Sequence, residues 1–141
     1  MGVRLMNGVL WLRISSIVSL LFALGHTLGG RQAWSPIGEN EVLASMRTVH
    51  FTVTGVSRSF LDFYRGFGYS LTVFLVLQAV LLWQLAAIAR SQPQIVRPLV
   101  ASFAISSVIG AFITWAFILP IPAMFSAVLT ACLVIAFVLL R

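Results

Sequence analysis

Four side chains of this sequence could carry acid–base chemistry, and all four fall in its first half. They are its two histidines and two of its three carboxylates: His26, Glu41, His50 and Asp62. Carboxylates and imidazoles are groups that enzymes use to move protons. Such a set is sufficient for isomerisation or cyclisation, or for addition of water to an epoxide. We expect Asp62 and Glu41 to act as acid and base, with the histidines assisting or orienting.

The stretch from residue 57 to residue 69 places charge among aromatic side chains. A helix is expected to begin at Ser57 or Ser59, because serine caps helix N-termini. On that helix Arg58, Asp62 and Arg65 share one face, where two guanidiniums would keep the carboxylate ionised. The alternative interpretation is an interfacial aromatic belt with a structural ladder of ion pairs. The residues expected to bind substrate are Trp34, Arg58, Phe63, Tyr64, Arg65, Phe67 and Tyr69.

His26 lies near the end of the first apolar run, among the glycines of residues 25–30. Those glycines leave room beside the imidazole for a ligand. The side chain could act as an acid or base, ligate a metal or haem, or bond to a head group. The alternative is a histidine bonded to a neighbouring helix. Residues 41–54 are expected to form an amphipathic helix near the membrane surface, which could cover His26 as a lid.

The composition places these residues in a membrane protein. Of 141 residues, 60% are hydrophobic and 9% are charged, against about a quarter charged in a soluble domain. All nine basic residues are arginines, and they stand at the ends of apolar runs rather than in a cluster. Nucleic acid is therefore not expected as a partner. One cysteine, Cys132, excludes an intramolecular disulfide and dithiol redox chemistry.

Four apolar runs are long enough to span a bilayer, which requires about 20 residues each. The sequence predicts an all-α membrane protein, a bundle of four transmembrane helices forming a single domain over residues 1–141. A polar loop at 31–58, carrying a short interfacial helix, separates the first two spans. Prolines at 120 and 122 divide the last uncharged stretch. The first run is expected to be a retained helix rather than a cleaved signal peptide. The expected spans are 10–30, 60–90, 98–119 and 122–141.

The distribution of arginines indicates the orientation. Arg4, Arg13, Arg90, Arg97 and Arg141 fall on one side of the expected spans, and the other four fall on the long-loop side. The excess favours cytoplasmic termini with the long loop outside. We expect the protein in a bacterial inner membrane.

Two short motifs suggest a family. Gly25-His26-Thr27-Leu28-Gly29 closes the first span, and Phe63-Tyr64-Arg65-Gly66-Phe67-Gly68 opens the second. This pairing resembles a loose group of small bacterial four-span proteins of unassigned function. The resemblance covers most of the chain and implies the four-span fold, but it implies no activity.

Three functions remain open. The first is an enzyme or binder for a hydrophobic small molecule, of isoprenoid, sterol-like or epoxide type, acting at the outer mouth of the bundle. The second is an accessory or structural subunit of a membrane complex. The third is a carrier of haem b with His26 and His50 as axial ligands. The first is preferred, with no metal and no cofactor expected. The bilayer and the small molecule are the expected partners, and a homo-oligomer remains open.

Overall fold

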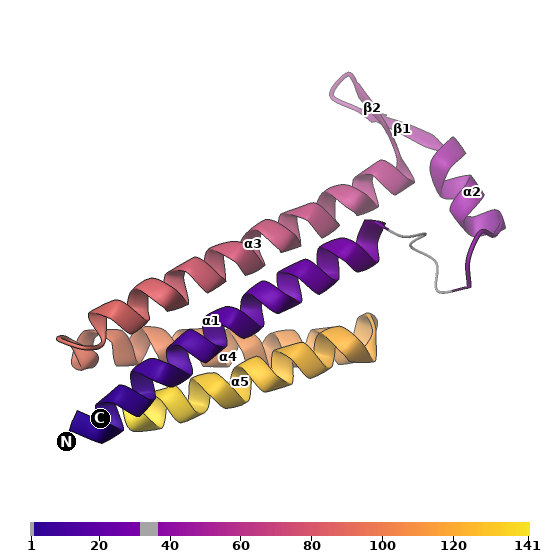
Figure 1. The fold of residues 1–141 in the computed structure, drawn as a ribbon. Helices are drawn as coiled ribbons and strands as arrows, with labels where there is room; N and C mark the ends of the chain where they lie inside the picture. Colours follow the sequence, from indigo (N-terminus) through magenta and orange to yellow (C-terminus); the bar gives the residue numbers. More distant parts are fainter. Residues whose placement is uncertain (1, 32–36) are drawn as a thin grey trace. The chain divides into compact units, whose positions relative to one another are not determined.

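The computed structural model describes residues 2–31 and 37–141 of the chain (Figure 1). Four helices are long and apolar enough to cross a membrane, which confirms the helical fold class, while the predicted spans stay predictions. The bundle arrangement and an interfacial position for the short helix stay predictions. In chain order the elements are α1 (Gly2–Arg31), α2 (Glu41–Thr48), β1 (His50–Val53), β2 (Val56–Ser59), α3 (Phe60–Ile88), α4 (Pro93–Phe117) and α5 (Pro120–Leu139).

The chain forms two compact units. We call Met1–Phe22 together with Leu75–Arg141 the core unit, and Ala23–Phe74 the loop unit. Helices α1 and α3 each begin in one unit and end in the other. The single membrane domain over 1–141 stays a prediction.

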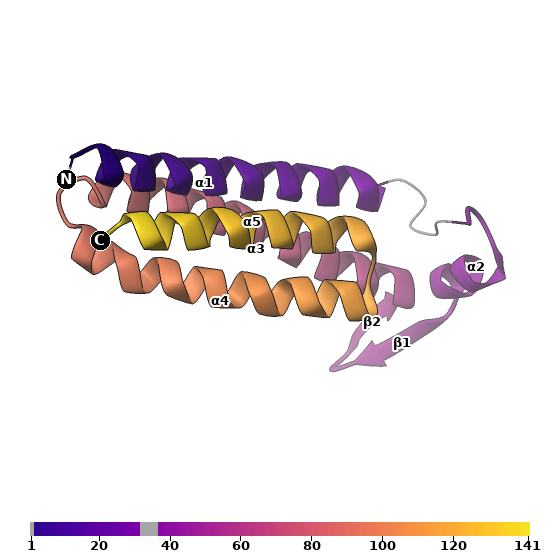
Figure 2. The same ribbon diagram turned by 90° about the horizontal axis from the view of Figure 1, so that it is seen from below.

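Apolar side chains from all four long helices form the hydrophobic cluster of the core unit. Within this unit α4 and α5 pack against each other along the hairpin that joins them (Figure 2). The buried members of the cluster are Val9, Leu12, Leu82, Leu85, Ala86, Ala89, Val96, Val100, Ala104, Leu129, Leu133, Ala136 and Leu140.

Prolines define the ends of the last two helices. Pro120 stands in the first turn of α5, where a backbone N–H would have no acceptor within the helix, so its absence in proline costs nothing. It therefore separates α5 from α4, as the sequence predicted. Helix α4 begins at Pro93, five residues earlier than expected, because Pro93 takes the favoured first-turn position and Pro98 is accommodated inside the helix.

Two serine hydroxyls join α1 to α3 inside the core unit. Ser16 Oγ donates to the carbonyl oxygen of Ala79 at 2.7 Å, and Ser19 Oγ donates to that of Leu75 at 2.9 Å. Ser15 is also buried, but its hydroxyl donates to the carbonyl oxygen of Trp11 in its own helix at 2.8 Å. Small side chains thus allow the two backbones to approach, as in other membrane helix pairs.

Residues 41–54 do not form one helix, which corrects the sequence-based expectation. Helix α2 runs from Glu41 to Thr48. Asn40 is its N-cap, and the side chain of Asn40 accepts a hydrogen bond from Leu43 N at 3.1 Å. The chain then forms an antiparallel hairpin in which His50 pairs with Ser59 and Val53 with Val56.

The cause of the hairpin is local. Residues 49–53 contain β-branched and aromatic side chains that favour strands. Thr54 and Gly55 both adopt positive φ, 50° and 81°, as a two-residue type I′ turn requires. Glycine reaches this conformation without strain, so the Thr-Gly pair is a hairpin signal. The lid helix expected over 41–54 is therefore limited to α2.

The serine bonds give the first testable prediction. Replacing Ser16 and Ser19 together by alanine should lower the free energy of unfolding in detergent by about 1 kcal/mol, since interhelical hydrogen bonds in membranes average about 0.6 kcal/mol each. Unfolding by titration with a denaturing detergent measures it. Ser102→Ala, which removes an exposed hydroxyl bonded within its own helix, is the control. Equal stability of the double variant and this control would show that the two bonds do not join the helices.

Candidate functional site

A small polar pocket lies in the loop unit, between the last turns of α1 and the first half of α3. Its volume is about 50 Å³, enough for a water molecule or the polar end of a ligand but not for a whole organic substrate. It is lined by His26, Thr27, Tyr64, Arg65, Gly68, Tyr69 and Thr72. We call it the His26 pocket.

Hydrogen bonds fix the polar wall of this pocket. His26 Nδ1 lies 3.2 Å from Thr72 Oγ1, and Thr27 Oγ1 lies 3.0 Å from the same oxygen. Thr27 Oγ1 also donates to the carbonyl oxygen of Ala23 at 2.7 Å, and Thr72 Oγ1 to that of Gly68 at 3.3 Å. The two threonines therefore connect the imidazole to the backbone of both helices.

Counting hydrogens in this network assigns the tautomer of His26. Each threonine hydroxyl carries one hydrogen, and that of Thr27 is used on the carbonyl of Ala23. A hydrogen from Thr72 to His26 Nδ1 would leave the 3.0 Å contact between the two threonine oxygens without a hydrogen, so the arrangement that bonds every contact sends it to Thr27. Thr72 Oγ1 then accepts from His26, and Nδ1 carries the hydrogen of the neutral imidazole.

Nε2 of His26 is then a hydrogen-bond acceptor. Within residues 2–31 and 37–141 no side chain or backbone group bonds to it. Gly68 borders the ring, since a Cβ at this position would lie 3.7 Å from His26 Cε1. The imidazole can therefore bind a donor group that enters the pocket, or take a proton from it.

Asp62 lies outside this pocket and closes the first turn of α3. Ser59 Oγ donates to Asp62 Oδ2 at 2.8 Å, and Ser59 N donates to the same oxygen at 3.2 Å. In return the backbone N–H of Asp62 donates to Ser59 Oγ at 3.1 Å. These reciprocal bonds form a capping box, which satisfies N–H groups that have no partner inside the helix.

The expected face of Arg58, Asp62 and Arg65 does not form. Helix α3 begins at Phe60, with Ser59 as the cap, and Arg58 belongs to β2. In the part of the chain that the structure describes, the ion pair present is Arg47 with Glu39, at 2.8 Å. Asp62 is therefore held by hydrogen bonds from Ser59, and Arg58 and Arg65 act on it by charge at longer range without forming an ion pair.

The other candidate acid–base residues lie on the surface. Glu41 is exposed in the first turn of α2. His50 is exposed at the start of β1, and its Nδ1 lies 2.8 Å from the carbonyl oxygen of Thr48. Neither lines the His26 pocket. Of the four residues, the structure thus places only His26 there.

The candidate binding residues divide into two groups. Tyr64, Arg65 and Tyr69 line the His26 pocket. Phe63 and Phe67 are exposed, and their rings pack edge-to-face with centroids 4.9 Å apart. The ring of Phe63 also packs edge-to-face with that of Phe51, with centroids 5.5 Å apart. They form an aromatic surface on α3. Trp34 lies outside the described residues.

The sequence reasoning missed three members of the pocket, namely Thr27, Gly68 and Thr72. A signal was present, because Arg65, Tyr69 and Thr72 follow at spacings of four and three, which align residues on one helix face. Extending that face by one turn would have found Thr72.

A haem does not fit the residues present. A porphyrin is far larger than the His26 pocket, and His50 does not line it. Among the described residues no group of three or more His, Cys, Asp or Glu side chains gathers as a metal site would require.

Comparison of the chain with models of protein families, with curated proteins and with solved structures finds no match.

The capping box supplies the second prediction. Asp62→Ala should destabilise the start of α3 by about 1 kcal/mol, because a capping carboxylate is lost. Hydrogen exchange of the amides of residues 59–63 should become faster. Glu41→Ala removes an exposed carboxylate of the loop unit and should leave these amides unchanged. If Asp62→Ala left the exchange rates unaltered, the capping role would be refuted.

Proposed function

We propose that this protein is an integral membrane protein that binds a hydrophobic small molecule by its polar end in the His26 pocket. The observation that carries the proposal is the acceptor nitrogen of His26, which no described residue bonds, in a pocket with Arg65 and two tyrosines. Polar groups inside apolar helices are costly unless they have a partner. A ligand that supplies this partner explains why a histidine stands at this position.

The chemistry of the lining selects the kind of polar end. Nε2 of His26 accepts a hydrogen, so the ligand must present a donor such as a hydroxyl or a protonated carboxyl group. The guanidinium of Arg65 only donates, so the same end must also present an oxygen. An alcohol or a carboxylic acid satisfies both. The rest of such a molecule would lie outside the small pocket, along apolar surface such as that of Phe63 and Phe67.

If the protein is an enzyme, His26 is the residue that would move the proton. A neutral imidazole with a free Nε2 is a general base, and Thr72 holds its other nitrogen in place. Asp62 in this proposal acts indirectly, because its capping box fixes the turn of α3 from which Tyr64 and Arg65 project. Isomerisation or hydrolysis would both begin with such a proton transfer.

Native mass spectrometry of the protein in mild detergent tests this proposal. The wild type should retain an apolar molecule with a hydroxyl or carboxyl end. His26→Ala should reduce its occupancy about tenfold, the factor that corresponds to one lost hydrogen bond of about 1.4 kcal/mol. His50→Ala removes the other, exposed histidine and is the matched control.

Two results would contradict the proposal. A wild-type protein that stays empty after addition of membrane lipid extract has no such ligand. Equal retention by wild type and His26→Ala would place the ligand elsewhere. Retained haem would favour the electron carrier instead.

A further inference from the structure

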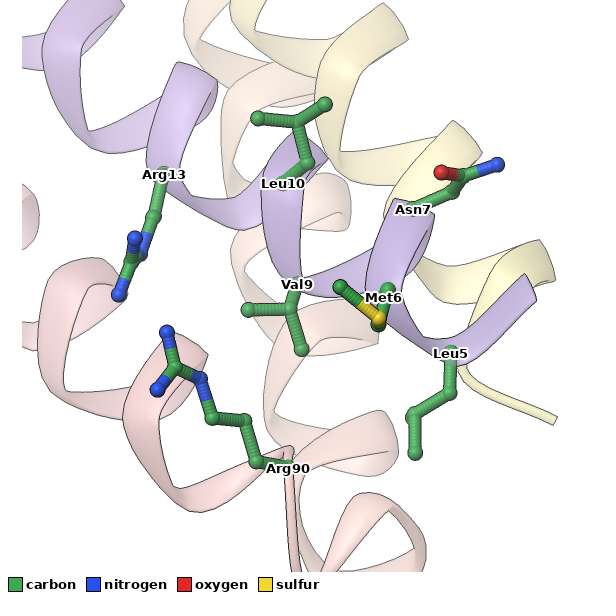
Figure 3. A pocket seen from close by; sticks show the side chains of 7 residues that line it. All are labelled: Leu5, Met6, Asn7, Val9, Leu10, Arg13 and Arg90. Atoms are coloured by element: carbon green, nitrogen blue, oxygen red, sulfur yellow. The ribbon is translucent and has the colours of Figure 1, made fainter. Parts of the chain in front are cut away.

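A second and larger pocket lies wholly within the core unit, at the end where α1 begins and α3 ends (Figure 3). Its volume is about 630 Å³. One wall consists of side chains from the first turns of α1, and the other is Arg90, which follows α3. The lining residues are Leu5, Met6, Asn7, Val9, Leu10, Arg13 and Arg90. None of them belongs to the His26 pocket.

Two arginines converge in this pocket. The side chain of Arg13 extends from α1 and that of Arg90 from the end of α3, with their guanidinium groups directed toward each other (Figure 3). Side chains on a helix lean toward its N-terminus, so Arg13 leans toward the end at which Arg90 lies. Two like charges repel each other, and the repulsion is stronger in apolar surroundings than in water. The arrangement therefore calls for an anion between them.

No acidic side chain of this unit can serve as that anion. All three acidic side chains, Glu39, Glu41 and Asp62, fall in the loop unit, and residues 1–22 and 75–141 contain neither Asp nor Glu. Arg97 of the same unit has Phe137 as its partner. Its Nε donates to the carbonyl of Phe137 at 3.3 Å, and its guanidinium lies 4.3 Å from the centre of the Phe137 ring.

Arg13 is only partly satisfied. Its guanidinium lies 5.0 Å from the centre of the Trp83 ring, which orients it by a cation–π contact. Its Nε, however, is buried and has no hydrogen-bond partner among the described residues. A buried charged donor without an acceptor is costly. The end of the guanidinium is directed toward Arg90 (Figure 3) and is the part that an acceptor in the pocket can reach.

We propose that this pocket binds the phosphate of an anionic phospholipid. Arginine presents a planar fork of N–H donors that matches phosphate oxygens, and two such forks can hold one phosphate from both sides. Basic pockets between membrane helices bind anionic lipid head groups in this way.

The apolar part of the lining selects a lipid over a free phosphate ion. Leu5, Met6, Val9 and Leu10 form most of one wall, and Met6 and Leu10 are exposed. These side chains gain nothing from an inorganic ion but can pack against an acyl chain. The volume is also larger than a phosphate needs.

The test is a titration of the delipidated full chain followed by native mass spectrometry. The probes are phosphatidylglycerol, phosphatidylcholine and inorganic phosphate, each added separately. The wild type should bind phosphatidylglycerol more tightly than phosphatidylcholine, and inorganic phosphate should not compete at equal concentration. Arg90→Gln and Arg13→Gln should each weaken phosphatidylglycerol binding by about tenfold or more, since each removes charge-assisted hydrogen bonds.

The control is Arg4→Gln, which removes the same charge from α1 at a residue that does not line the pocket. It should leave the affinity unchanged. Arg90 is exposed, so Arg90→Gln tests the site even if Arg13→Gln fails to fold. An equal loss of affinity with Arg4→Gln would mean that the effect comes from net charge alone, which would overturn the proposal. Competition by inorganic phosphate at equal concentration would overturn the lipid assignment.

Discussion

The structure depends on one constraint, namely that polar groups on apolar helices have to find partners within the protein. An unpaired amide or hydroxyl in hydrocarbon costs several kcal/mol, more than a helix gains from a single interhelical hydrogen bond. Serines and threonines of the long helices meet this constraint by bonding to carbonyls. Ser102, Thr114 and Thr130 bond within their own helices, whereas Ser16 and Ser19 bond across to α3. The second kind joins α1 to α3 inside the core unit.

The same constraint gives meaning to the polar atoms that remain unpaired. His26 lines a pocket with Arg65, where its Nε2 is bonded by no described residue and can take an external partner. Arg13 lines a pocket with Arg90, but its Nε is buried, so a ligand there would bind the end of the guanidinium. Gln78 Nε2 is also buried without a partner in the described part of the chain, and it lines neither pocket. We have no physical account of it.

The sequence predicts the helices better than the loop, for a physical reason. Hydropathy over 20 or more residues is a strong signal, and it predicts four long apolar helices. Their limits differ from the expected ones by at most five residues, except that α1 begins at Gly2 and not near residue 10. Residues 41–54 carry helical periodicity and strand-forming side chains together, and the Thr54–Gly55 turn decides between them. Asp62 illustrates a similar competition. Its spacing from two arginines suggested chemistry, while the Ser59-x-x-Asp62 pattern specified a helix cap.

The pocket itself is predictable only in part. Tyr64, Arg65 and Tyr69 follow from helical spacing, and His26 follows from its unusual place in an apolar run. Spacing also puts Thr72 on this face, but it does not make Thr72 the partner of His26, because a threonine in such a run ordinarily bonds to its own helix. Only the approach of α1 to α3 within the loop unit turns it into the partner of His26. That approach depends on tertiary packing, which the spacing of residues along the sequence does not specify.

The tautomer of His26 tests the central claim most directly. The account requires hydrogen on Nδ1, donated to Thr72, and a free Nε2. Nitrogen-15 NMR of the histidine-labelled protein at a pH well above the usual histidine pKa of about 6.5 distinguishes the two neutral forms, and His26→Ala identifies the signal. The account predicts the Nδ1–H form for His26, changing to the Nε2–H form or a mixture in Thr72→Val. A wild-type His26 with hydrogen on Nε2 would contradict it, because the imidazole would then present a donor to the pocket.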